Sequence, residues 1–111
     1  MVLRSYANAD LAKLGYDVVT MDGSVDRKTA RAICGDNVSL QGNYDPANLI
    51  PGEGKSESTV QETARELLKD LGPQRLIANL GEGLGGKEST DLVKAFVDFI
   101  HDESAAMIAA E

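Results

Sequence analysis

Residues 15–41 read GYDVVTMDGSVDRKTARAICGDNVSLQ, and this stretch decides the fold. It opens with an apolar, β-branched run at 16–21, continues as a helical pattern at 26–34, and returns to a short apolar run at 38–41. Gly, Asp and Asn bound each segment, as they commonly do at the ends of strands and helices. The stretch therefore predicts a strand–helix–strand unit, whose two strands run parallel.

The same alternation continues on both sides of this unit. Short apolar runs at 2–3 and 76–80 predict two further strands, and helical patterns cover 10–14, 58–71 and 89–101. The sequence therefore predicts an α/β fold with a parallel sheet and about four βα units.

Capping residues mark the expected helix ends. Asp26 can cap the helix at 26–34 and Gly35 can end it. Ser58 and Gln61 predict a capping box at the start of the longest helix. The apolar stripe of the last helix consists of Leu92, Val93, Phe96, Val97 and Ile100.

Four βα units are about half of a (β/α)8 barrel, which needs roughly 250 residues. A half-barrel leaves strand edges unpaired and one sheet face uncovered, and open edges invite pairing with another chain. A small open sheet with helices on both faces is the alternative. A Pro- and Gly-rich loop at 48–57 follows the third strand. With either architecture, we expect another protein chain as partner.

Composition restricts the class of protein. The chain has 111 residues and a net charge of −7, so it forms one domain at most and disfavours nucleic acid and anionic lipid as partners. No apolar run approaches the ~20 residues of a membrane span. The single cysteine, Cys34, excludes an internal disulfide, suits a reducing compartment, and is expected in the core.

The glycine-rich segment at 81–86, GEGLGG, matches the G-x-G-x-x-G pattern after a strand and before a helix. A dinucleotide site would need a second strand that ends in an acidic residue about 20 residues later, and the chain does not provide one. The remaining interpretations are a loop whose backbone N–H groups face an anion and a tight turn that needs positive φ.

Four carboxylates lie near predicted strand ends: Asp17, Asp22, Asp26 and Asp45. Such residues can act as acid and base or bind a metal, but their spacing matches no metal loop. Turn formation and helix capping are the favoured roles, although Asp22 and Asp45 follow their strands on the side where barrel sites form.

The remaining polar candidates do not form a catalytic set. His101 is expected at the end of the last helix and has no second histidine as companion, so helix-dipole stabilisation or exposure is favoured over a metal role. Tyr6, Tyr16 and Tyr44 are too scattered to make a stacking platform for bases. The sequence therefore predicts neither catalytic residues nor a metal site.

Three motifs in order carry a specific resemblance. They are GYDVV at 15–19 with MD at 21–22, LQGNYDP at 40–46, and IANLGEG at 77–83. The tail VKAFVDFIH at 93–101 fits the same pattern. Over nearly its whole length the chain resembles the C-terminal part of uroporphyrinogen decarboxylase.

The resemblance implies a (β/α)8 TIM barrel that removes carboxyl groups from uroporphyrinogen to give coproporphyrinogen, without cofactor or metal and commonly as a homodimer. Residues 1–111 would supply the C-terminal half, strands five to eight with their helices, with no second domain. It also implies tetrapyrrole binding at Gly81, Glu82 and Gly83, where the family usually has His in place of Glu82. A Trp usually stands in place of Gly23. The location implied is the cytoplasm or a plastid.

The family's essential arginines and its aspartate facing the pyrrole nitrogens lie in the N-terminal part and have no counterpart in this chain. A carboxylate at Glu82 would also repel an octacarboxylate substrate. We therefore expect the chain to be inactive alone and to need the missing half-barrel. The alternative is a non-catalytic structural or binding subunit of a larger assembly, photosynthetic or respiratory, derived from this enzyme.

Overall fold

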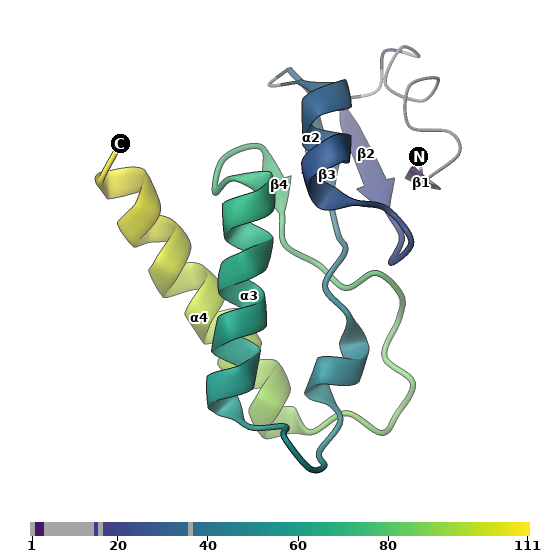
Figure 1. Cartoon of the computed structure of the whole chain (residues 1–111), viewed down its shortest axis with the longest axis vertical. Helices are drawn as coiled ribbons and strands as arrows, with labels where there is room; N and C mark the ends of the chain where they lie inside the picture. The colour runs from purple at the N-terminus through teal and green to yellow at the C-terminus, as the bar shows by residue number, and fades with distance from the viewer. Residues whose placement is uncertain (1, 4–14, 16, 36) are drawn as a thin grey trace.

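Strands and helices alternate along the described part of the chain, as the sequence predicts (Figure 1). The structure is a computed structural model that describes residues 2–3, 15, 17–35 and 37–111. The helix expected at 10–14, together with Tyr6 and Tyr16, lies outside the described residues. The elements are β1 (Val2–Leu3), β2 (Val18–Met21), α2 (Arg27–Cys34), β3 (Ser39–Gln41), the 3-10 helix η2 (Pro46–Leu49), α3 (Glu57–Leu71), β4 (Leu76–Ile77) and α4 (Thr90–Ala109).

The four strands form one parallel sheet in the order β1-β2-β3-β4. In register, Thr20 pairs with Gln41, and Gln41 pairs with Ile77. Spatial order equals chain order, whereas a doubly wound sheet with helices on both faces reverses its strand order at a switch point. The predicted parallel α/β sheet is confirmed. Closure into a barrel and the numbering of the strands as five to eight stay predictions.

The two faces of the sheet differ in burial. Val19, Met21 and Leu40 are fully buried and point into the helix layer. Thr20 and Gln41 point to the other face and are only half-buried, and Ile77 in the same row is 47% exposed. Because side chains alternate along a strand, this pattern shows that the helices of the described residues cover one face and leave the other open.

Helix α3 packs between α2 and α4 and provides the centre of the core (Figure 1). Its apolar stripe is fully buried over nearly its whole length: Val60, Ala64, Leu67, Leu68 and Leu71. Tyr44, from the segment after β3, is also fully buried, and its ring lies 4.3 Å from that of Phe96 on α4. The aliphatic core thus contains one aromatic pair that joins the sheet to the last helix.

The start of α3 corrects one prediction. The helix begins at Glu57, one residue earlier than expected, and its N-cap is Ser56, two residues before the predicted Ser58. The Ser56 hydroxyl accepts a hydrogen bond from the Thr59 backbone N–H, and the Thr59 hydroxyl accepts one from the Ser56 backbone N–H. The capping box predicted for Ser58 and Gln61 is therefore wrong, because Thr59 takes the role that Glu or Gln usually has.

Helix α4 is longer than predicted. It begins after its N-cap Ser89 and continues to Ala109, so His101 is an exposed residue inside the helix rather than at its end. Val97 is 46% exposed, which removes it from the predicted buried stripe, whereas Leu92 and Phe96 are buried. No helix among the described residues has the length and apolarity needed to cross a membrane.

The predicted ends of α2 and the predicted burial of Cys34 are confirmed, whereas the loop after β3 differs from the prediction. Asp26 caps α2, and Gly35, with φ of 70°, ends it with a bond from its N–H to the Arg31 carbonyl. Cys34 is 8% exposed in the core, and burial raises the pKa of its thiol. The predicted 48–57 loop is shorter than expected, because η2 forms its first turn.

Candidate functional site

A cleft of about 670 Å³ lies at the carboxyl ends of β2, β3 and β4. The segments that follow these three strands line the cleft. They contribute Asp22 and Gly23 after β2, Asn43 and Asp45 after β3, and Gly81 and Glu82 after β4. In parallel α/β sheets this is the edge where ligands bind, because the loops from several strands converge there.

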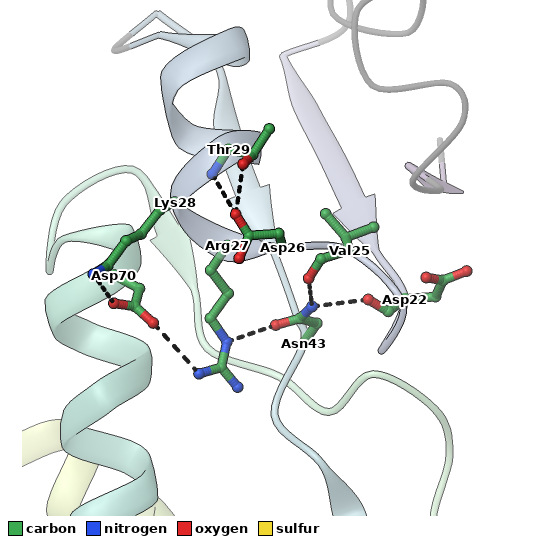
Figure 2. A network of polar contacts seen from close by, with 8 residues as sticks. All are labelled: Asp22, Val25, Asp26, Arg27, Lys28, Thr29, Asn43 and Asp70. Carbon is green, nitrogen blue, oxygen red and sulfur yellow. Dashed lines mark hydrogen bonds and ion pairs between the residues drawn. The ribbon is translucent and has the colours of Figure 1, made fainter.

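Asn43 fixes the floor of the cleft. Its side chain is 4% exposed, and its Nδ2 donates to the backbone carbonyls of Asp22, at 2.8 Å, and Val25, at 3.0 Å. Its Oδ1 accepts from Nε of Arg27 at 2.8 Å (Figure 2). Both ends of the amide are therefore committed, and the segment after β3 is tied to the turn between β2 and α2.

Arg27, the first residue of α2, brings a positive charge to the cleft. Its Nη1 lies 3.9 Å from Oδ2 of Asp70, and Nζ of Lys28 lies 3.9 Å from the other Asp70 oxygen. Figure 2 shows the guanidinium between Asp70 and Asn43, with one terminal nitrogen facing Asp70 and the other pointing away from both. The Nε–Asn43 contact is a hydrogen bond, whereas 3.9 Å to Asp70 is too long for one.

Among the described residues, carboxylates dominate the lining, with one cation, Arg27, against Asp22, Asp26, Asp45, Asp70 and Glu82. Asp26 accepts from the Thr29 backbone N–H and hydroxyl, bonds that lower its pKa. Asp45 accepts from the Ala47 N–H as the cap of η2. The predicted capping roles are confirmed, and among the described residues no group of three His, Cys, Asp or Glu is placed to hold a metal ion.

Three backbone N–H groups of the glycine-rich loop donate to acceptors within the chain. The Gly81 N–H donates to the Tyr44 carbonyl at 2.8 Å. The N–H groups of Gly85 and Gly86 donate to the two carboxylate oxygens of Glu88, each at 2.9 Å, and the bonds that these glycines donate help to lower the Glu88 pKa. The chain's own carboxylate thus occupies the anion position that the loop offers.

Gly81 also lies at a close approach between loops. A Cβ on Gly81 would lie 3.0 Å from the Gly23 backbone nitrogen and 3.2 Å from its Cα. Contacts this short are tighter than usual, so a side chain at residue 81 would push the segments after β2 and β4 apart by a few tenths of an ångström. At Gly23 a Cβ would meet nothing within 4 Å, which leaves room there for a side chain.

The structure brings some of the predicted site residues together. Gly81 and Glu82 line the cleft with Asp22, whereas Gly83 is exposed and outside the lining. Asp17 is exposed and also outside it. Substrate binding by Gly81, Glu82 and Gly83 stays a prediction.

Sequence reasoning missed Asn43, Arg27 and Asp70 as parts of one network. Asn43 stood inside the LQGNYDP motif, and that motif was the available signal. Arg27 and Asp70 are 43 positions apart in the sequence, in helices whose charged residues read as solvated faces, so nothing local connected them.

The family of the chain follows from comparison with known sequences. The family model described as uroporphyrinogen decarboxylase (URO-D) matches residues 4–103. The chain belongs to the uroporphyrinogen decarboxylase family. The resemblance seen in the three motifs is thereby confirmed, and the cleft residues Asn43 and Glu82 both fall inside the matched region.

Individual relatives give the same result. The chain is 42% identical over 99 residues to uroporphyrinogen decarboxylase of Homo sapiens, which is 89% of this chain and 26% of that protein. It is 39% identical over 103 residues to that of Danio rerio (93% and 27%) and 33% identical over 102 residues to that of Salinibacter ruber (92% and 28%). The chain thus spans about a quarter of the length of the curated relatives it matches.

Proposed function

We propose that this chain is a segment of a uroporphyrinogen decarboxylase-like protein of tetrapyrrole biosynthesis, and that it forms one side of a tetrapyrrole pocket without catalysing decarboxylation by itself. In this proposal its sheet supplies strands five to eight of a barrel. The observation that carries the proposal is the cleft, which lies at the carboxyl ends of the strands and contains Gly81 and Glu82.

The charge of the cleft supports inactivity of the chain alone. Five carboxylates and one guanidinium give the described part of its lining a formal charge of −4. An octacarboxylate substrate and the negative charge that develops during decarboxylation both need compensating cations. Within the proposal, those cations come from the N-terminal part of the barrel, and the protein works in the cytoplasm or a plastid.

The open sheet face supports a protein partner. No helix among the described residues covers the row formed by Thr20, Gln41 and Ile77, and within that part of the chain β1 and β4 each have one strand neighbour in the sheet. Parallel sheets are normally covered on both faces, so a further layer or the remaining strands of a barrel would complete this one.

A hybrid enzyme tests the proposal. The 111-residue chain is co-expressed with human uroporphyrinogen decarboxylase lacking the 99 aligned residues, and coproporphyrinogen formation is measured on the purified pair. We expect the two chains to copurify, and we expect Glu82→His to raise turnover at least about tenfold over the unchanged chain. Glu82→Gln serves as a control that removes the charge without adding an imidazole.

Two results would overturn the proposal. If the two chains fail to associate, the chain is not a segment that completes the barrel. If the isolated 111-residue chain turns over uroporphyrinogen, it does not depend on residues of another chain for catalysis.

The acidic cleft and the open face also favour a second candidate, a non-catalytic subunit of a larger assembly. Native mass spectrometry of the chain purified from its source, with a uroporphyrinogen assay on the same sample, separates the two. A complementary barrel half with turnover supports the first candidate, and unrelated partners without turnover support the second.

A further inference from the structure

The two arginines of α2 use their guanidinium groups differently. Arg31 donates from Nε, Nη1 and Nη2 to backbone carbonyls, so each of its nitrogens is bonded within the fold. Arg27 donates from Nε to Asn43 and approaches Asp70 with Nη1 at 3.9 Å. The terminal nitrogens of Arg27 therefore retain hydrogen-bonding capacity at the cleft, and those of Arg31 do not.

The orientation of Arg27 is set in advance of any ligand. Asn43 accepts from Nε, and the Asn43 amide cannot rotate without losing its two bonds to the carbonyls of Asp22 and Val25. A guanidinium held through Nε presents its two terminal nitrogens together, the geometry that pairs end-on with a carboxylate. Little side-chain entropy is then lost when a ligand binds.

We propose that Arg27 is the carboxylate-binding residue of this cleft, and that the cleft accepts one carboxylate arm of a ligand that also carries hydrogen-bond donors. This deepens the proposed function and rests on it for the tetrapyrrole: Arg27 holds a single carboxylate side chain while the rest of the ring lies beyond.

The surrounding carboxylates give the selectivity. Asp26 and Asp45 each use an oxygen on a local N–H, and a carboxylate has about four lone-pair sites, so both keep acceptor capacity for a ligand N–H group. Among the residues that the structure describes, Arg27 is the one cation in the lining, so a second ligand carboxylate near the first would lie closest to carboxylates. The cleft therefore favours one carboxylate with neighbouring donors over a cluster of carboxylates.

Titration with small probes tests this on the whole 111-residue chain. The probes are pyrrole-2-carboxylate, its uncharged carboxamide and benzene-1,3,5-tricarboxylate, and the readout is two-dimensional 1H–15N NMR that includes the Arg27 Nε–H signal. We expect pyrrole-2-carboxylate to shift that signal and to bind at least about tenfold more tightly than either other probe.

Lys28 offers a matched control for the variant. It is adjacent to Arg27 and pairs with the same Asp70 carboxylate, but it is outside the cleft lining. R27Q and K28Q remove the same charge, and we expect R27Q to weaken pyrrole-2-carboxylate binding about tenfold and K28Q to weaken it by less than about twofold. R27K keeps the charge but loses the oriented fork, and we expect an intermediate loss.

The outcomes are distinct. Equal weakening by R27Q and K28Q would show general electrostatic attraction and overturn the assignment, and so would tighter binding of the tricarboxylate. An R27K variant that binds as well as the unchanged chain would show that orientation by Asn43 contributes nothing. If R27Q is unfolded, binding by R27K and the comparison of pyrrole-2-carboxylate with its carboxamide still test whether Arg27 binds the carboxylate. These experiments measure binding and not turnover. The assignment of Arg27 can therefore hold when the hybrid enzyme is inactive, and it can fail when the hybrid enzyme is active.

Discussion

The two ends of the sheet use arginine for opposite purposes. At the amino end, Arg31 joins α2 to the end of α3 and to the segments that lead into β3 and β4, through the carbonyls of Leu71, Val38 and Arg75. At the carboxyl end, Arg27 has a fixed Nε and terminal nitrogens that face a cleft. The same helix thus stabilises one end of the sheet and presents a charge at the other, as βα units do when stability and function lie at opposite ends.

Replacing Arg31 should have the largest effect on stability. Arg31→Ala removes charge-assisted hydrogen bonds to several carbonyls at once, and we expect a loss of about 4 kcal/mol in the free energy of unfolding, measured by urea denaturation. Arg65→Ala is the control, because Arg65 is 49% exposed and has a 3.9 Å ion pair with Glu103. A similar loss in both variants would show that the amino end is not specially stabilised by Arg31.

Gly42 tests the packing where β3 leaves the sheet for the cleft. Its φ is 118°, and a Cβ there would lie 2.6 Å from the Met21 carbonyl oxygen. We expect Gly42→Ala to cost about 3 kcal/mol, from strain and from the collision. Gly54→Ala is the matched control, with φ of 75° and nothing within 4 Å of its Cβ, and should cost about 1 kcal/mol. Equal costs would mean that the backbone moves to admit the methyl group.

Asn43 connects stability to function at the carboxyl end. Asn43→Ala leaves two carbonyls without a donor and should cost about 2 kcal/mol of stability. It should also broaden or shift the Arg27 Nε–H signal, because the acceptor of that group is lost. Asn43→Asp keeps an acceptor for Arg27 but not the two donors, so it should lose stability and retain that signal. An Arg27 Nε–H signal that is unchanged in Asn43→Ala would show that Asn43 does not hold the Arg27 side chain in place.

The sequence predicted local features better than it predicted contacts between distant segments. Strand runs, the helix stop at Gly35 and the Asp26 cap were predictable, because each depends on neighbours within a few residues. The longer α4 and the start of α3 at Glu57 were not, since helix ends depend on marginal differences that packing decides.

The candidate site was predictable only where a motif marked it. Glu82 and Gly81 were found through the 77–83 motif, and they line the cleft. The role of Asn43 required knowledge that its amide meets the turn after β2, a contact 21 positions away for Asp22. Such a contact depends on the register between β2 and β3, which the sequence pattern alone does not specify.

The smallest effect expected is on stability at acid pH, through two carboxylates that accept hydrogen bonds from residues close in sequence. The pKa of Asp26 is lowered by its bonds to Thr29, and that of Glu88 by bonds from backbone N–H groups led by Gly85. For a carboxyl whose folded-state pKa is depressed, the stabilisation is complete above the unfolded-state pKa of about 4 and is lost as the pH falls through the lower folded-state value. Stability should therefore decline below about pH 4.

Asp26→Asn should reduce the steepness of this decline while leaving stability at pH 7 nearly unchanged, because Asn is also a good N-cap. Glu88→Gln should reduce it too, but should loosen the glycine-rich loop, since an uncharged amide offers one acceptor oxygen where Glu88 now supplies two. Urea unfolding at a series of pH values measures both effects, with Asp45→Asn at the cap of η2 as the control variant. If neither variant changes how steeply the free energy of unfolding falls with pH, other carboxylates govern acid unfolding. The hydrogen bonds of Asp26 and Glu88 then shape the backbone without making its stability depend on pH.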